Sequence, residues 1–187
     1  MDKTRTGDIF DAYVETLIGR EGGYVNNPDD RGGETIWGIT AAVAREWGYR
    51  GSMRDMPRET AKAIYRSRYW TAPRFDKVAE LNPLIAEELL DTGVNMGPAV
   101  AVTFLQRALN VLNRKGADYA DIAVDGRIGP ATLGALAAYL RKRGAAGESV
   151  MMKALNGLQA ARYIELCEKR EANETFGFGW LAQRVGF

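Results

Sequence analysis

The sequence has 187 residues and almost balanced charge, with 25 basic and 24 acidic side chains. That length is enough for one compact unit with a good core, and the charge balance provides no strong field for nucleic acid. Histidine is absent and Cys167 is the single cysteine, which excludes an internal disulfide, the usual zinc cages and imidazole-dependent catalysis. Any catalysis must rest mainly on carboxylates, hydroxyls, lysine or tyrosine, and we expect no metal and no cofactor.

Apolar residues at helical spacing predict a first helix over residues 8–20, with Ile9, Tyr13, Leu17 and Ile18 on one face and a stop at the glycines that follow. Glu21 then lies at the helix C-terminus, where the macrodipole disfavours an anion and tends to raise the carboxyl pKa.

Helical periodicity vanishes over residues 24–39, where turn-rich segments flank short β-prone pieces. This pattern predicts a small β-hairpin or ribbon. Thr40 is the predicted N-cap of a helix that runs to Trp47 and is closed by Gly48.

Further helices are predicted in RETAKAIYRSRYW, from Asn82-Pro83 to about Leu90, and from Pro98 to about residue 112. The segment DTGVNMGP is interpreted as a polar connector between the last two of these, and the alternative is that its Asn95 lines the far wall of a substrate cleft. Pro130 begins another helix, Ser149 is the predicted cap of a long one, and the aromatic tail is expected to dock on the body. The fold class is therefore mainly α with one small β element.

The stretch after the first helix holds two carboxylates suited to glycoside hydrolysis, which typically uses one protonated acid and one carboxylate acting as base or nucleophile. Glu21 is the candidate acid. Asp30, nine residues later in a polar turn, should stay ionised, and the hydroxyl of Thr35 could hold a water. A purely structural interpretation remains open, in which Glu21 binds loop amides, Asp30 forms a turn and Thr35 is a strand residue.

Aromatic and amide side chains near this stretch are candidates for binding sugar, because pyranose faces present C–H groups to aromatic rings. Core packing is an equally good explanation for each ring, and Asn before proline is ordinary turn chemistry. The candidate substrate-binding residues are Tyr24, Asn26, Trp37, Thr40, Tyr69, Trp70 and Asn95.

The run EGGYVNNPDDRGGETIWGIT resembles the signature of glycoside hydrolase family 108, the N-acetylmuramidases of phage endolysins and of some bacterial secretion-linked muramidases. The resemblance extends through DTGVNMGPAVAVTFLQRALN, VDGRIGPATLGAL and FGFGWLAQR, and the later part resembles the peptidoglycan-binding half of that family. It implies a lysozyme-like helical fold, with a catalytic part in residues 1–93 and a peptidoglycan-binding part in residues 94–187 packed on it as one compact unit.

The resemblance also maps the family's catalytic acid onto Glu21. Phage-type lysozymes place an Asp nine residues after their catalytic Glu and a Thr six residues after that Asp. Asp30 matches the first of these positions, whereas position 36 is Ile and Thr35 is offset by one.

The implied activity is hydrolysis of the β-1,4 bond between N-acetylmuramic acid and N-acetylglucosamine, with peptidoglycan glycan strands as partner. We expect a monomer with no nucleic acid and no stable membrane insertion. Two alternatives stay open: a lytic transglycosylase, which needs only the Glu, and a non-catalytic peptidoglycan-binding or secretion-assembly protein. The sequence MDKTRTGDIFDAYV has no apolar signal-like region, so we expect synthesis in the host cytoplasm and action on periplasmic peptidoglycan after holin-type or dedicated release.

Overall fold

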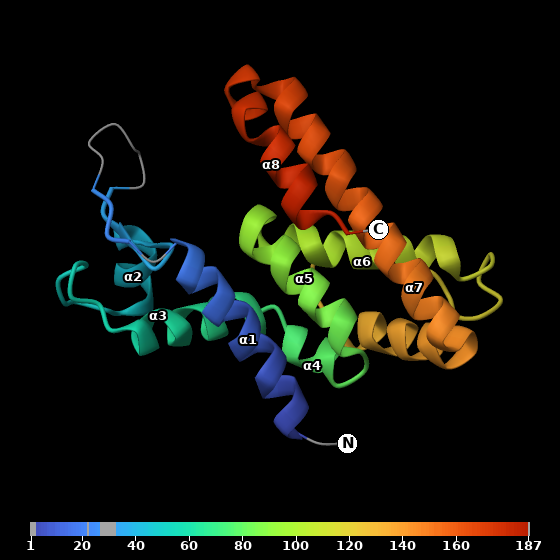
Figure 1. Cartoon of the computed structure of the whole chain (residues 1–187). Helices are drawn as coiled ribbons and strands as arrows, with labels where there is room; N and C mark the ends of the chain where they lie inside the picture. Colours follow the sequence, from blue (N-terminus) through green and yellow to red (C-terminus); the bar gives the residue numbers. More distant parts are fainter. Residues whose placement is uncertain (1–2, 22, 27–32, 187) are drawn as a thin grey trace. The chain divides into compact units, whose positions relative to one another are not determined.

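The computed structural model describes residues 3–21, 23–26 and 33–186 (Figure 1). The chain forms two compact units, Met1–Ala72 and Pro73–Phe187. The first contains α1 (Lys3–Glu21), β1 (Thr35–Ile36), β2 (Ile39–Thr40), α2 (Ala41–Trp47), α3 (Arg58–Tyr65) and the π-helix η1 (Arg66–Thr71). The second contains α4 (Phe75–Ala79), α5 (Pro83–Met96), α6 (Pro98–Leu112), α7 (Pro130–Lys169), the 3-10 helix η2 (Glu171–Asn173) and α8 (Glu174–Arg184).

The predicted mainly α fold with a small β element is confirmed. The compact units divide at Ala72, whereas the functional division after residue 93 stays a prediction.

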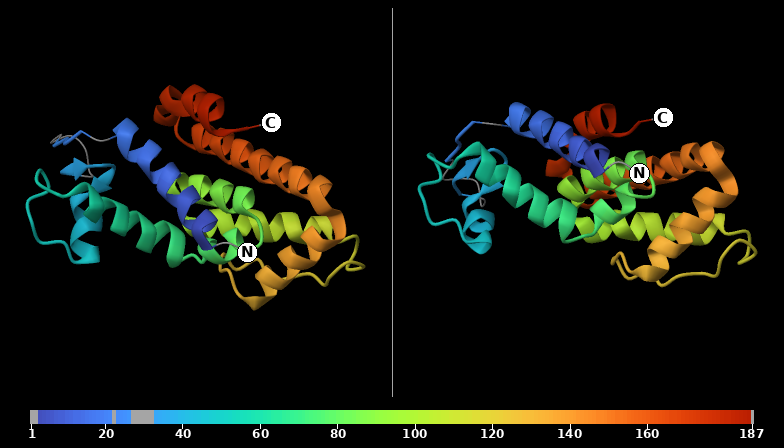
Figure 2. Two further views of the ribbon diagram at one scale, coloured as in Figure 1. Left: turned by 60° about the horizontal axis from the view of Figure 1, so that its bottom comes forward. Right: turned by 90° about the horizontal axis from the view of Figure 1, so that it is seen from below.

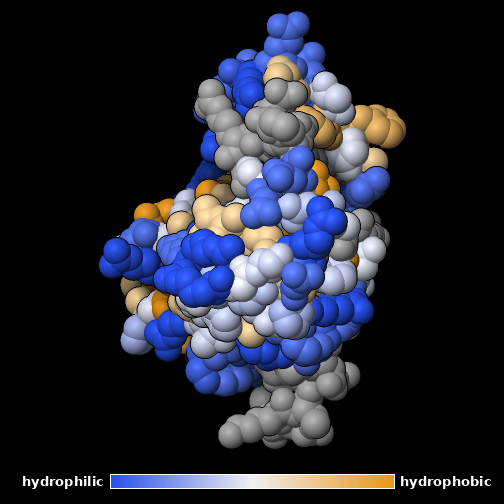
Figure 3. Space-filling view, turned by 90° about the vertical axis from the view of Figure 1, so that its left-hand side faces the viewer, coloured by the Kyte–Doolittle hydropathy of each residue, from blue (hydrophilic) through white to orange (hydrophobic). Residues whose placement is uncertain are grey.

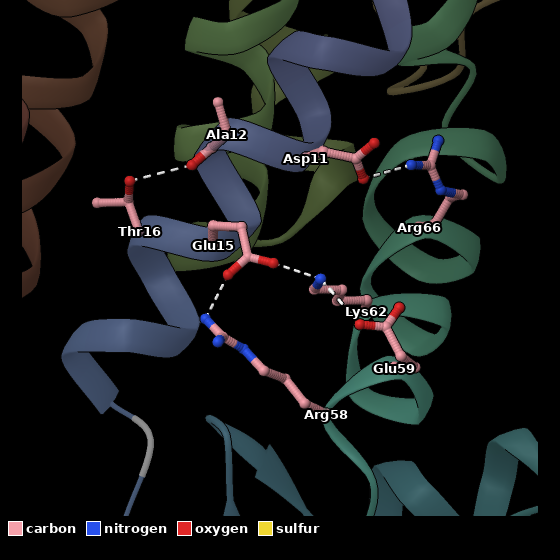
Figure 4. Close-up of polar contacts among 8 residues, drawn as sticks. All are labelled: Asp11, Ala12, Glu15, Thr16, Arg58, Glu59, Lys62 and Arg66. Carbon is pink, nitrogen blue, oxygen red and sulfur yellow. Dashed lines mark hydrogen bonds and ion pairs between the residues drawn. The ribbon is translucent and has the colours of Figure 1, made fainter.

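Helix α1 runs antiparallel to the α3–η1 segment in the first unit. Asp11 pairs with Arg66 at 2.6 Å, while Glu15, one turn further along α1, pairs with Lys62 and Arg58 of α3 (Figure 4). The residue numbers of the ion-pair partners fall as those in α1 rise, so the two helical segments run in opposite directions. Figure 2 also shows this.

The buried face of α1 differs from the predicted one. Phe10, Val14 and Ile18 are fully buried at i, i+4 spacing, and Leu17 joins them. Ile9 and Tyr13, which were predicted on this face, are only half-buried. The sequence has apolar residues on both adjacent stripes of the helix, so periodicity alone could not choose between them.

The β element is a two-stranded antiparallel hairpin that pairs Thr35 with Thr40 and Ile36 with Ile39. Its turn residues, Trp37 and Gly38, have φ of 54° and 73°, the left-handed pair that a tight two-residue hairpin needs. The predicted hairpin in residues 24–39 is therefore confirmed.

Helix α2 begins and ends at the predicted residues. The hydroxyl of Thr40 accepts a hydrogen bond from the Val43 amide, and Gly48 closes the helix with φ of 106°. Because the last hairpin residue is also the N-cap, the hairpin fixes the start of α2.

The second unit packs α5 against α6 and α6 against α7. Helix α5 begins at the predicted Asn82-Pro83, where Asn82 caps it by accepting a hydrogen bond from the Ile85 amide at 3.0 Å. The interpretation of DTGVNMGP as a connector is wrong, because α5 continues through Met96 and only Gly97, with φ of 94°, separates it from α6. Gly93 is buried there, and a Cβ at this position would crowd the ring of Phe75, which would lie 3.1 Å away.

Helix α7 turns sharply within its length (Figure 2), and its backbone leaves helical geometry at Gly144. Gly144 has φ of 57° and ψ of −147°, a conformation that essentially only glycine adopts. Ser149 lies inside α7 rather than at its N-cap, so that prediction is wrong: the glycine, not the serine, starts the second half of the helix.

The aromatic tail docks on α7, as predicted. Trp180 of α8 stacks on Tyr163 of α7 with ring centroids 5.1 Å apart, and Phe176 stacks on Trp180 at 5.9 Å. Among the described helices, none combines the length and the apolar character needed to cross a bilayer.

Two glycine substitutions in α7 test the kink. Gly144→Ala should lower the free energy of unfolding by about 1–3 kcal/mol, because alanine is strained in this conformation. Gly134→Ala, at an exposed helical position where a Cβ meets nothing within 4 Å, should raise it by about 0.5–1 kcal/mol. Urea unfolding of both variants checks this, and equal effects at the two positions would contradict the account of the kink.

Candidate active site

Glu21 is the last residue of α1, so the sequence correctly placed it at the helix C-terminus. Its side chain and Asp30 lie outside the described part of the structure. Four residues after Glu21, the chain pairs with the first strand of the hairpin. Val25 and Thr35 exchange two backbone hydrogen bonds of 2.8 Å. This pairing places Thr35 beside a residue only four positions after the candidate acid.

Within the part of the chain that the structure describes, the hydroxyl of Thr35 is only weakly engaged. It lies 3.4 Å from the Gly33 carbonyl oxygen, to which it donates, and the residue is half-buried. A hydroxyl held by one long hydrogen bond remains able to bind a further group.

Tyr24 makes a contact that the sequence analysis missed. Its hydroxyl donates to a Glu34 carboxylate oxygen at 2.7 Å, and the Arg54 guanidinium lies 4.6 Å from the ring centroid. The hydrogen bond to Glu34 raises the pKa of Tyr24. One ring face therefore carries a cation, and the residue is half-buried. Glu34 belongs to the motif that drew attention to Glu21, but nothing in its spacing indicates a tyrosine partner.

Trp37 is held in place from two sides. Its indole Nε1 donates to the Met56 carbonyl oxygen at 2.9 Å, and its own carbonyl oxygen accepts a hydrogen bond from the Tyr65 hydroxyl at 3.2 Å. The side chain is half-buried. Trp37 thus has a fixed orientation and retains exposed area, as an aromatic platform requires.

Trp70 does not have the surface that its predicted role needs. It is 3% exposed, and its ring packs 5.6 Å from that of Phe10, centroid to centroid. This candidate is corrected to a core residue. Tyr69 is half-buried and lies 5.7 Å from the ring of Tyr65, so part of its surface is available.

The remaining candidates have different surroundings. Asn26 is exposed next to the bridge of Val25. The Thr40 oxygen accepts the capping hydrogen bond of α2, so its O–H is left as a donor. Asn95 belongs to the second unit, where it is exposed on α5 and donates to the Asp91 carbonyl oxygen at 2.8 Å.

Glu15 shows that not every carboxyl group on α1 suits acid catalysis. Its hydrogen bond with Lys62, together with the nearby charge of Arg58, lowers its pKa (Figure 4). Glu15 therefore stays ionised at neutral pH and cannot supply a proton to a leaving group.

The face of the molecule that carries α2 and α3 is predominantly hydrophilic, with small separate apolar patches (Figure 3). Within the described residues, no group of three or more histidine, cysteine, aspartate or glutamate side chains could hold a metal ion.

Comparison with known proteins defines the class. Residues 14–97 match the family model of glycosyl hydrolase 108, and residues 100–185 match that of a predicted peptidoglycan domain. The structure of SagA from Brucella abortus is similar, with 29% sequence identity, a TM-score of 0.70 and coverage of 95% of this chain and 90% of that one. No curated protein matches the sequence.

The chain is a glycoside hydrolase that acts on peptidoglycan, with a lysozyme-like helical fold. Its glycosyl hydrolase 108 region comprises residues 14–97, and a peptidoglycan domain follows in residues 100–185.

Two substitutions of Tyr24 separate stacking from hydrogen bonding. Tyr24→Ala should raise KM for peptidoglycan about three- to tenfold, because a ring contact of about 0.5–1.5 kcal/mol is lost. Tyr24→Phe keeps the ring and should stay within about threefold of wild type. Turbidity kinetics on purified cell walls would measure both, and an equal loss in the two variants would assign the role of Tyr24 to its contact with Glu34 instead.

Proposed function

We propose that the protein is a muramidase that hydrolyses the β-1,4 bond between N-acetylmuramic acid and N-acetylglucosamine, with Glu21 as general acid. The observation that carries the proposal is the pairing of Val25 with Thr35 directly after α1. This pairing joins the segment that follows Glu21 to the first strand of the hairpin. Both lie inside the region that matches the hydrolase family.

Glu21 is suited to protonating the leaving glycosidic oxygen because of its position. A carboxyl group at a helix C-terminus meets the negative end of the macrodipole, which favours its protonated form. A general acid must hold its proton near neutral pH, so a raised pKa is what this step requires. Glu15, one and a half turns earlier on the same helix, is instead kept ionised by Lys62 and Arg58.

Asp30, helped by the hydroxyl of Thr35, is proposed to direct a water molecule to the anomeric carbon. If the carboxyl groups of Glu21 and Asp30 stand about 6.5–9.5 Å apart, water fits between them and the configuration inverts; about 5–5.5 Å would give a covalent, retaining route.

The substrate would lie along the hairpin. Trp37, fixed by Met56 and Tyr65, and the half-buried ring of Tyr24 would supply aromatic surfaces for sugar rings. Asn26 supplies an exposed amide for an acetamido or peptide group.

We further propose an endolysin-type role, in which the protein reaches periplasmic peptidoglycan by holin-type or dedicated release and works as a monomer. The support for this role is chemical: the substrate is outside the cytoplasmic membrane, and one chain joins a hydrolase region to a peptidoglycan domain.

Removing the acid tests the proposal. Glu21→Gln should lower kcat on purified peptidoglycan by about 10²–10⁴-fold, because an amide cannot donate a catalytic proton. The release of new reducing ends measures the rate.

Glu15→Gln is the matched control, since it removes a carboxylate from the same helix. It should leave kcat within about threefold of wild type. Near-normal activity in Glu21→Gln with a loss in Glu15→Gln would contradict the assignment of the acid.

A further inference from the structure

A groove of about 450 Å³ lies in the second unit, where α5 and α7 meet the end of α8 and the residues after it. Its lining combines a carboxylate and polar groups with the apolar side chains of Met152, Ala182 and Val185. The polar lining residues are Glu88, Asn156, Gln183 and Arg184.

Glu88 is the unusual group of this groove. It is half-buried, and this burial, followed by the nearby charge of Asp91, raises its pKa to about 7. Its hydrogen-bond donors, Asn156 and Thr92, are neutral. Among the described residues, Glu88 forms no ion pair. Partial burial without a cation makes the charged form of a carboxylate less favourable.

Asp91, one turn further along α5, is compensated. Arg184 donates to one of its carboxylate oxygens at 2.9 Å, and the Gln159 amide donates to the other at 3.1 Å. Arg184, the cation in the lining of the groove, is therefore already paired with Asp91. The other charged neighbour acting on Glu88 is Glu87, which adds a further negative charge.

The end of the chain forms one wall of the groove. The Gly186 amide donates to the side-chain oxygen of Asn156 at 2.6 Å, and the Asn156 amide donates to the Met152 carbonyl oxygen at 3.0 Å. Asn156 itself is 4% exposed. These contacts fix the wall that faces Glu88.

We propose that this groove binds an alkyl ammonium group of peptidoglycan, the side chain of a diamino acid in the stem peptide, with Glu88 as the acceptor. The ammonium supplies the cation that Glu88 lacks, and Met152 and Val185 cover the methylene groups of its stalk. The assignment of peptidoglycan as ligand rests on the function stated above.

The groove should bind the ammonium group more tightly above neutral pH than below it. Glu88 must be ionised to accept from a cation, and its pKa of about 7 means that it is half protonated near pH 7. Affinity should therefore fall as pH drops from about 8 to about 6, and binding should release protons.

The test is isothermal titration of the full chain with a disaccharide-peptide whose diamino acid amine is free, and with the same compound acetylated on that amine. We expect the free amine to bind about ten- to a hundredfold more tightly, as for other hydrogen bonds to charged groups. Glu88→Gln should abolish this difference and its pH dependence. Equal affinity of wild type for the two compounds would overturn the proposal.

Glu87→Gln is the matched control. Glu87 is exposed on the same helix and does not line the groove, so the variant should retain the preference for the free amine. If both Glu87→Gln and Glu88→Gln lost the preference for the free amine, the net charge of the protein would explain the preference. That result would overturn the proposed site. Circular dichroism of both variants confirms that they are folded.

A second ligand pair distinguishes two sources of an amine. Chitotetraose and its de-N-acetylated form carry no peptide, and we expect neither to show a difference that depends on Glu88. A preference for the deacetylated sugar, without one for the free peptide amine, would overturn the assignment to the stem peptide.

The disaccharide-peptide lacks the bond that Glu21 is proposed to cut, so this test is independent of catalysis. Failure here leaves the Glu21 assignment intact, and an active Glu21→Gln leaves the groove intact.

Discussion

The candidate site depends on the fixed position of Phe10 in α1. Its ring lies 5.6 Å from that of Trp70 and 4.3 Å from the Arg66 guanidinium, so one aromatic residue is held by a core ring and by a cation. Arg66 also pairs with Asp11. The row of ion pairs along α1 is exposed and contributes little alone, but together with the buried face of Phe10, Val14 and Ile18 it sets the helix position. That position determines where Glu21 ends the helix.

The hairpin completes this arrangement, and it is the part that the sequence predicted best. The cap at Thr40, the stop at Gly48 and the turn near Trp37 and Gly38 each follow from local chemistry in a few adjacent residues. Such features can be predicted because their energetics do not depend on distant parts of the chain.

The wrong and missed sequence predictions concern features that depend on contacts between residues far apart in the chain. Trp70 could not be told from a surface ring because its burial depends on Phe10, sixty residues away. The end of α5 was missed because DTGVNM looks polar and glycine-rich, whereas Gly93 is there to admit the ring of Phe75. The contact of Tyr24 with Glu34 and Arg54 was invisible for the same reason. Tertiary contacts overrode local propensity at each of these positions.

The chain joins a hydrolase region, in which Glu21 is proposed to act, to a peptidoglycan domain. Glu88 of α5 belongs to the hydrolase region and lines a groove together with residues of that domain. Mass spectrometry of borohydride-reduced fragments from digested peptidoglycan tests the central claim most directly. A muramidase predicts fragments that end in muramitol. Fragments with anhydro-muramyl ends would show a transglycosylase, fragments that end in glucosaminitol would show cleavage of the other linkage, and either result would contradict the proposed reaction.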